Sequence, residues 1–262
     1  MKKESPYHIE SLQRGLQVLT LFNRERPALS LTEIVEATGI KKSTAFRIVN
    51  TLNSTGYLER DPDTRQYRPG LKVLQLGFTA ISSLELRQVA RPHLVNLAEM
   101  SGETASLSVL DGLEVVYVDR IRGRDIIVGV VLGVGSRIPA HCASMGKVLL
   151  ANLPADELAR RLDGATLSPC TPHSLVDKDQ LRAELEQIRS QGFAVNDEEL
   201  EIGLRAVAAP IWDQDNQVVA VINVSGSVRT ISAERLENEL TPAVRDTARL
   251  ISQSIGFSSY GL

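Results

Sequence analysis

The sequence contains few of the residues that mark disulfide-rich, metal-binding or membrane proteins. Cys142 and Cys170 are its only cysteines, and they form neither a metal-ligand spacing nor a disulfide framework. No stretch approaches the ~20 apolar residues that a membrane-spanning helix needs. A secretory signal has an apolar run after its first residues, and this sequence has none there. We therefore expect a cytoplasmic protein with no membrane partner, no metal and no cofactor.

The sequence also lacks a strong excess of positive or negative charge, since the formal net charge of the 262 residues is only −3. Lys and Arg outnumber Asp and Glu 11 to 8 over the first 70 residues, whereas acidic residues outnumber basic ones 24 to 18 in the remainder. A mildly basic segment on an acidic body is typical of a protein that touches DNA with one end only. The length suffices for two domains, each with its own core.

Residues 30–52 have the pattern of two short helices joined by a tight turn. Ser30 and Glu33 form a capping-box pair, which predicts a helix that begins at Leu31. Gly39 supplies the left-handed residue that ends this helix. A second helix begins near residue 42 or 43, with a buried stripe at helical spacing that consists of Ala45, Ile48, Val49 and Leu52.

The other side of this second helix carries short hydrogen-bonding side chains and one long cation, which a DNA major groove accepts. The candidate base-contacting residues are Lys42, Ser43, Thr44, Phe46, Arg47 and Asn50. Two strand-like runs follow at 56–60 and 66–68, and such a hairpin after a recognition helix is a wing. Its Arg60, Arg65 and Arg68 are positioned to meet phosphates. The alternative is a helical hairpin inside an enzyme, with Arg47 and Lys42 merely solvated.

The chain divides into three predicted parts. We expect a winged helix-turn-helix domain over 1–70, in which Leu12, Leu16, Leu19, Leu21 and Phe22 let a first helix close a three-helix core. Linker helices over 71–102 are apolar at helical intervals and must pack on the second domain or on a partner subunit. A palindromic operator is read by a two-fold protein, so we expect a dimer.

The remaining residues, 103–262, alternate strands and helices. Asp111-Gly112 is a strong hairpin signal between strands at 105–110 and 113–118. Further strands are expected at 125–132, 207–211 and 218–224, and helices at 144–153, 155–162, 177–191 and 233–255. An antiparallel sheet with packed helices is an α+β plan suited to ligand binding.

Several segments together carry a resemblance to a known family. They are Arg14-Gly-Leu, the motif at 30–52, the wing, and the segments 135–151, 196–210 and 221–226. Over essentially its whole length the chain resembles IclR-family transcriptional regulators. Segment 136–146 is most similar to members that control aromatic-acid breakdown through the β-ketoadipate route. The resemblance implies a winged helix, a linker helix and a GAF-like effector domain, in a homodimer or homotetramer.

In such regulators a small carboxylate binds in the effector domain. Carried over to this chain, the resemblance implies a site lined by Ala143, Ser144, Met145, Asn196, Ala206, Asn223 and Ser225, with His141 at its edge. Ser144 begins a helix whose free N–H groups can hold a carboxylate. Members that bind very small 2-oxo acids tend to have an acid, a cysteine and a serine at positions 196, 206 and 223. The residues found here make the pocket larger and less anionic, which favours a ring-bearing acid.

Some residues also permit an enzymatic interpretation. His141 and Cys142 could form a base and a thiol nucleophile, but adjacent side chains on an extended segment point to opposite faces. We therefore expect no pairing between them. Tyr117 and Trp212 could stack on a ring, although packing in the core is the expectation.

The acidic run Asp197-Glu198-Glu199 could suggest a metal site, but no His or Cys lies nearby at ligand spacing. A solvated acidic turn is the expectation for Glu199. Arg137 either clamps a carboxylate or pairs with Glu198.

The functional prediction is a non-enzymatic regulator of a catabolic operon, repressor or activator, with two partners: double-stranded operator DNA and a small carboxylate. The alternatives are a regulator that answers a 2-oxo acid, a constitutive repressor, and an enzyme with an accessory DNA module.

Overall fold

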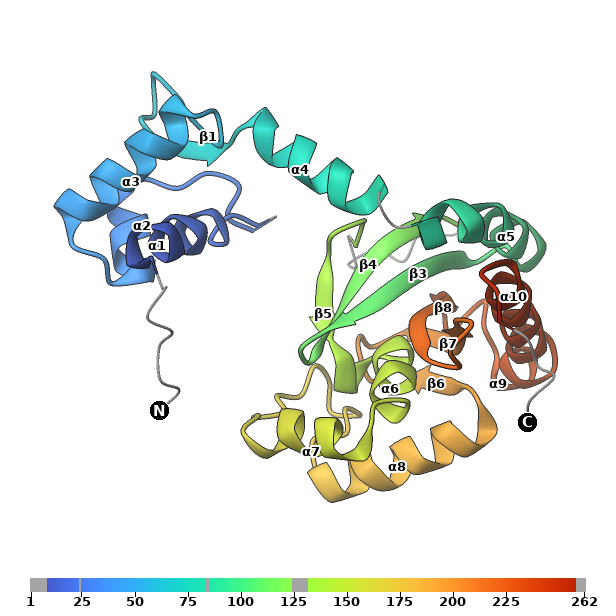
Figure 1. Ribbon diagram of the computed structural model, residues 1–262. Coiled ribbons are helices and arrows are strands. Elements are labelled where there is room, and N and C mark those ends of the chain that lie inside the picture. Colours follow the sequence, from blue (N-terminus) through green and yellow to red (C-terminus); the bar gives the residue numbers. More distant parts are fainter. Residues whose placement is uncertain (1–8, 24, 83–84, 124–131, 258–262) are drawn as a thin grey trace. The chain divides into compact units, whose positions relative to one another are not determined.

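The computed structural model describes residues 9–23, 25–82, 85–123 and 132–257, which divide into the units Met1–Ser83 and Leu84–Leu262 (Figure 1). The first unit contains α1 (Glu10–Leu19), α2 (Leu31–Thr38), α3 (Lys42–Ser54), β1 (Leu58–Arg60), β2 (Tyr67–Pro69) and α4 (Leu71–Ser82). The second begins with α5 (Glu85–Ser101). The α+β class is therefore confirmed, whereas the division at residues 70 and 102 stays a prediction.

Local capping chemistry sets the helix-turn-helix. Ser30 Oγ accepts a hydrogen bond from the Glu33 amide at 3.3 Å, and the Glu33 carboxylate accepts one from the Ser30 amide at 2.7 Å. Gly39 ends α2 with φ of 66°, in the left-handed region that glycine adopts without strain. α3 then begins at Lys42, as the sequence predicts.

The core of this unit differs from the prediction at its first helix. Val18 is the only fully buried side chain that α1 contributes, while Leu19, Leu21 and Phe22 are partly buried. Leu12 and Leu16 are instead 60% and 55% exposed. The prediction that these two leucines close the three-helix core is wrong, because they line an open groove beside α3 and α4 instead of the buried core.

The second unit is built on one six-stranded antiparallel sheet with the order β5-β4-β3-β8-β7-β6. Its strands are β3 (Thr104–Asp111), β4 (Glu114–Ile121), β5 (Arg137–Pro139), β6 (Ala194–Asp197), β7 (Leu204–Trp212) and β8 (Val218–Ser227). Asp111 pairs with Glu114 across the predicted turn, where Gly112 has φ of 63°. The strand predicted at 125–132 lies almost entirely outside the described residues.

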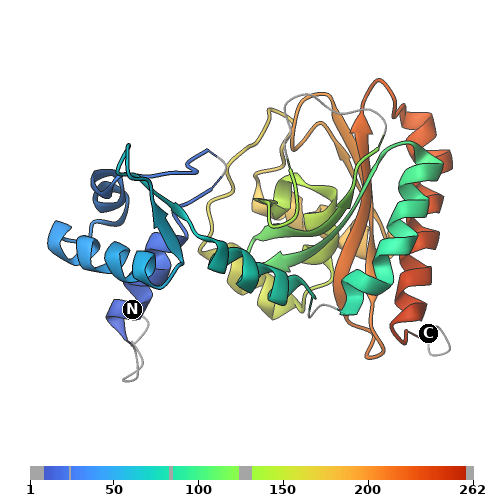
Figure 2. The ribbon, with the colours of Figure 1, turned by 90° about the horizontal axis from the view of Figure 1, so that it is seen from above.

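Helices cover both faces of this sheet. One face packs on α5 and α10 (Thr241–Ser254) through residues such as Leu94, Leu107, Ile222 and Ile251. The other packs on α6 (Ser144–Ala151) and α8 (Lys178–Gln191). Figure 2 shows α5 and α10 side by side on one face of the sheet, with the yellow-green to yellow helices of the unit across the sheet.

Besides one π-helical turn, three short pieces complete the described part of the second unit. They are η1 (Ala140–Cys142), α7 (Ala155–Asp163) and α9 (Ala233–Arg235). The helix predicted over 233–255 is not continuous, because a π-helical turn at Leu236–Leu240 separates α9 from α10. There Thr241 Oγ1 donates to the carbonyl of Leu236 at 2.7 Å. Within the described chain, no helix has the length and apolar character to cross a membrane.

All eight residues of helix α6 are buried. A Cβ atom added at Gly146 would lie 2.1 Å from the carbonyl oxygen of Ala140 in η1. Lys147 is 1% exposed, and its Nζ lies 2.8 Å from Glu184 of α8 and 2.5 Å from Glu199 in the loop after β6. Close backbone approach and one buried cation therefore fix this helix.

We expect Gly146→Ala to destabilise the protein, because backbone atoms occupy the space that the added methyl group needs. Overpacking of this kind costs about 1–3 kcal/mol or more. Gly164→Ala is the matched control, since nothing lies within 4 Å of the position of its Cβ. Thermal unfolding of the full-length protein measures both, and equal unfolding midpoints would show that α6 can move away from η1.

Candidate DNA-binding and effector-binding sites

The outer side of α3 presents most of the predicted base-contacting residues to solvent. Lys42, Ser43, Phe46, Arg47 and Asn50 are exposed, while Thr44 is half-buried. Phe46 is 49% exposed, which is high for an aromatic side chain on a helix that has a core to pack on. An exposed ring beside short hydrogen-bonding side chains offers both apolar and polar contacts to base edges.

The wing carries its three arginines on exposed positions. Arg60 lies over the ring of Tyr67, 5.8 Å from its centroid. Arg68 pairs with Glu59 on the neighbouring strand at 3.1 Å, and such exposed pairs contribute only ~0–1 kcal/mol. Arg65 stands at the tip with a left-handed φ of 59°. The Arg68 pair is weak enough for a phosphate to replace it.

One face of the sheet in the second unit collects buried polar atoms. Within the described part of the chain, Ser106 Oγ, Ser108 Oγ, Asn196 Oδ1 and Asn223 Oδ1 are buried without a hydrogen-bond partner. Buried polar groups in native proteins are almost always hydrogen-bonded, so four exceptions together call for an explanation. We name these four residues the polar cluster.

The strand register places the polar cluster on the face that packs on α6. Ser106 lies directly opposite Asn223, and Asn223 in turn lies opposite Ala208. Ala208 belongs to the core around α6, whereas the alternating residue Leu107 belongs to the core around α5 and α10. Because side chains alternate along a strand, the polar cluster faces α6.

The start of α6 adds a second source of hydrogen-bond donors. Ser144 is its first residue, and Ala143 precedes it as an N-cap without a side-chain hydrogen bond. The first N–H groups of a helix have no partner within the helix, and its N-terminus favours an anion. Asn196 is tied to this region, because its Nδ2 donates to the carbonyl of Cys142 at 2.6 Å.

Most of the predicted effector residues therefore come together. Asn196, Ala206, Asn223 and Ser225 share one sheet face through the pairs Asn196–Ala206 and Ala206–Ser225. Ala143, Ser144 and Met145 are buried at the start of the helix that covers this face. The sequence interpretation missed Ser106 and Ser108, although serines two positions apart on an otherwise apolar strand are the signal that could have identified them.

Arg137 does not join this group. It is exposed on the edge strand β5, and its guanidinium lies 2.7 Å from both Asp111 and Glu114 at the β3–β4 hairpin. These hydrogen bonds raise the pKa of Arg137 above its ordinary value. Neither expectation for Arg137, a carboxylate clamp or a pair with Glu198, is therefore found, because the sheet register puts it beside two other carboxylates.

The expectation for His141 and Cys142 is also wrong in its reasoning. The segment is a turn of 3₁₀-helix rather than an extended strand, so the two side chains do interact. Both are buried, and His141 Nε2 lies 2.9 Å from the carbonyl oxygen of Ser168.

Glu199 is no solvated turn residue, because it forms the ion pair with buried Lys147. The neighbouring Asp197 forms an ion pair with Arg205. The carboxylate of Glu198 accepts a hydrogen bond from the Gly203 amide. No group of three or more His, Cys, Asp and Glu side chains in the described regions could hold a metal ion. Tyr117 packs in the core as expected.

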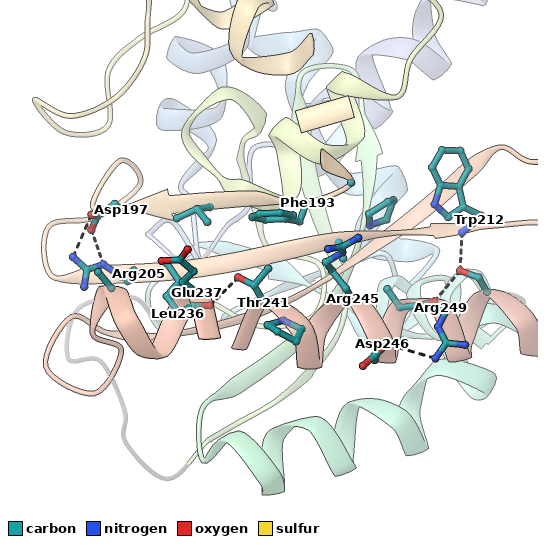
Figure 3. Close-up of a pocket in the computed structure, with 18 of the residues that line it drawn as sticks. Phe193, Asp197, Arg205, Trp212, Leu236, Glu237, Thr241, Arg245, Asp246 and Arg249 are labelled. Carbon is teal, nitrogen blue, oxygen red and sulfur yellow. Dashed lines mark hydrogen bonds and ion pairs between the residues drawn. The ribbon is translucent and has the colours of Figure 1, made fainter. Parts of the chain in front are cut away.

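A cavity of about 1000 Å³ lies on the opposite face, between α10 and the strands β6 and β7 (Figure 3). Trp212 lines this cavity rather than the core. Four of the charged side chains that line the cavity form ion pairs: Arg205 pairs with Asp197 at 2.7 Å and Arg249 with Asp246 at 3.5 Å. The guanidinium of Arg245 lies over the ring of Phe193. None of the predicted effector residues lines it. At the polar cluster the Ser106 and Ser108 hydroxyls can donate to a carboxylate, and the Asn196 and Asn223 oxygens can accept from a ring hydroxyl.

Two family models match this chain in the order of its two units. The IclR helix-turn-helix domain matches residues 11–62, and the bacterial transcriptional regulator IclR C-terminal domain matches residues 78–253. The second match alone covers more than half of the chain.

Known proteins match over nearly the full length. The transcriptional regulator XynR of Escherichia coli (strain K12) is 33% identical over 95% of this chain and 98% of its own. The Pca regulon regulatory protein of Pseudomonas putida is 36% identical over 93% and 83%. A solved IclR homologue from Microbacterium hydrocarbonoxydans in complex with 4-hydroxybenzoate superposes with a TM-score of 0.80, at 26% identity over 94% and 98%.

The exposed face of α3, the wing and the helix-covered sheet thus occur together with both family models and with relatives above 30% identity over nine-tenths of the sequence. The chain belongs to the IclR family of bacterial transcriptional regulators.

Proposed function

We propose that this protein is a cytoplasmic, non-enzymatic regulator of a catabolic operon, whose operator binding responds to a small aromatic carboxylic acid. The exposed residues of α3 and of the wing would contact DNA. The polar cluster and the start of α6 would hold the acid. The ligand of a solved relative supports the chemical class, since the Microbacterium protein is complexed with 4-hydroxybenzoate. The Pca regulon regulatory protein, which is 36% identical over 93% of this chain, supports the role as regulator of an operon.

The polar cluster is the observation that carries the proposal. Its four unpartnered atoms come from three strands, and all face the same helix. Hydroxyl groups can donate or accept, so Ser106 and Ser108 suit a ring hydroxyl or a carboxylate. The start of α6 favours the negative charge. The cluster itself carries no charge, so binding near pH 7 does not require the cluster to take up a proton.

The DNA side of the proposal also implies two copies of the chain. Leu12, Leu16 and Leu76 are exposed by 60%, 55% and 57%, and they line a groove of about 730 Å³ within the first unit. Contiguous exposed apolar surface of this kind marks an interaction site. A second copy is the occupant that fits, because a two-fold protein reads a palindromic operator.

We expect Arg47→Ala to weaken operator binding by about 1–3 kcal/mol, the contribution of one good base contact. Phe46→Ala should also weaken binding, and Ser43→Ala should change base preference. Arg249→Ala in the second unit removes the same charge far along the chain from α3 and serves as the control. Fluorescence anisotropy at fixed salt measures all four, and equal affinity for Arg47→Ala and the control would remove α3 from the groove.

We expect an oligomer with an even number of subunits, a dimer or a tetramer, at micromolar concentration. The double variant Leu16→Asp, Leu76→Asp should lose operator binding, because charges in the apolar groove oppose pairing of the two DNA-binding units. Val176→Asp, at an exposed position in the second unit, is the control. Sedimentation velocity gives the subunit number, and a monomer of the unmodified protein with and without DNA would contradict the proposal.

We expect Asn223→Leu to lose the effector response while operator binding remains. The substitution removes an unpartnered carbonyl and keeps the branched shape of the side chain, so the unfolding midpoint should not fall. Asn96→Leu, the same change on an exposed position of α5, should leave the response intact. Calorimetry with 4-hydroxybenzoate, protocatechuate and muconate, beside glyoxylate and pyruvate, tests the ligand class.

The comparison of ligands tests the chemical class of the effector, and the comparison of variants tests where the effector binds. Binding of glyoxylate or pyruvate alone would contradict an aromatic effector and leave the polar cluster in place. Full effector affinity in Asn223→Leu would instead move the site away from the cluster. A bound acid at 100 times its dissociation constant stabilises the protein by ~2.7 kcal/mol, so thermal shifts offer a second measurement.

A further inference from the structure

The two cysteines of this chain lie in contact although 28 residues separate them. The thiol of Cys170 donates to Cys142 Sγ at 2.7 Å. Cys142 ends η1 and is fully buried, whereas Cys170 is exposed, and both are free thiols. The regulatory mechanism proposed above uses neither sulfur.

Hydrogen bonds that do not involve sulfur hold this contact in place. Ser174 Oγ accepts from the backbone amides of Cys170 and Thr171, each at 2.9 Å. The same hydroxyl donates to the carbonyl of Glu199 at 2.7 Å. On the other side, the carbonyl of Cys142 accepts from Asn196. The segment 168–174 is thereby fixed against η1 with the two sulfurs facing each other.

The surroundings of the pair favour a shared thiolate. Burial raises the pKa of Cys142, but hydrogen bonds with His141, Cys170 and Ser174 outweigh it and bring the pKa to about 7. Burial and the contact with Cys142 raise the pKa of Cys170 to about 12. Although burial opposes it, the hydrogen bonds of His141 to Cys142 and to the Ser168 carbonyl raise the pKa of that imidazole. The first proton lost therefore belongs to the pair, and it can move between the sulfurs.

We propose that Cys142 and Cys170 are a redox-active dithiol that closes to a reversible intramolecular disulfide when the protein meets a peroxide. The pair shares its remaining proton across the 2.7 Å contact, and when that proton moves to Cys142 the exposed Cys170 is the thiolate. That thiolate attacks one peroxide oxygen: an S–O bond forms, the O–O bond breaks, and the leaving oxygen takes up a proton.

The buried sulfur of Cys142 then attacks the sulfenic sulfur of Cys170. The S–S bond forms, the S–O bond breaks, and water leaves. In total the two thiols lose two electrons and two protons, and hydrogen peroxide becomes two waters. A disulfide of about 2.0 Å requires only a small further approach of the two sulfurs. An added thiol reductant reverses the reaction through a mixed disulfide.

The test uses the full-length protein, reduced, freed of reductant and treated with hydrogen peroxide. After denaturation in N-ethylmaleimide, intact mass should show the loss of two hydrogen atoms and a fall from two maleimide adducts to none. Peptide mapping should join the peptides that contain Cys142 and Cys170. Two adducts after peroxide treatment, or separate oxygen additions on each cysteine, would overturn the proposal.

Two variants distinguish the roles of the sulfurs. In Cys142→Ser the exposed cysteine has no resolving partner, so dimedone should trap a sulfenic acid that it does not trap in the unmodified protein. In Cys170→Ser the remaining thiol is buried, so the maleimide adduct should persist after the same treatment. Loss of that adduct at the unmodified rate would show that oxidation starts at Cys142 and would overturn the assigned order.

Discussion

The ion pair between Lys147 and the carboxylates of Glu199 and Glu184 is the constraint on which the effector unit depends. A lysine that is 1% exposed would be costly alone, and breaking a buried pair by removing one partner costs about 3–5 kcal/mol. Its partners lie on α8 and after β6, so α6 can take only one position between them. The fixed position of α6 sets where its N-terminus points, and the polar cluster faces that helix.

Sequence reasoning succeeded where the determining contacts are local. The capping box of Ser30 and Glu33, the left-handed Gly39 and the Asp111-Gly112 turn each depend on residues within four positions. The grouping of Asn196 with Asn223 came from the family resemblance and not from a local pattern, and the strand register places both on one face. Only the capping box, the left-handed glycine and the turn are local in this sense. Such features follow from backbone sterics and hydrogen-bond satisfaction, which are encoded within a few residues.

Sequence reasoning failed where the partner is distant along the chain. Glu199 is 52 residues from Lys147, and Arg137 is 26 from Asp111. A charged residue gives no local sign of which opposite charge the sheet register will bring to it. Burial has the same limit: Leu12 and Leu16 have the spacing of core residues, and only the packing of α1 leaves them exposed.

The sheet faces differ in a way that bears on switching. The strand residues that face α5 and α10, such as Leu107 and Ile222, are mostly apolar, and no buried side-chain atom of a described strand residue on this face lacks a hydrogen-bond partner. The face toward α6 buries unpartnered oxygens, and a ligand that satisfies them regains the desolvation cost of each, about 1–3 kcal/mol per group. Ser106 and Ser108 lie on β3, which follows α5 after two residues, and Arg91 of α5 bonds Asp119 of β4 at 2.7 Å. A ligand held by β3 would therefore act on a strand that is joined to α5 covalently and whose neighbour β4 is joined to α5 by an ion pair; α5 follows α4 in the chain. Only a ligand that favours one position of this strand and helix could shift operator binding, because equal affinity for both positions would shift nothing.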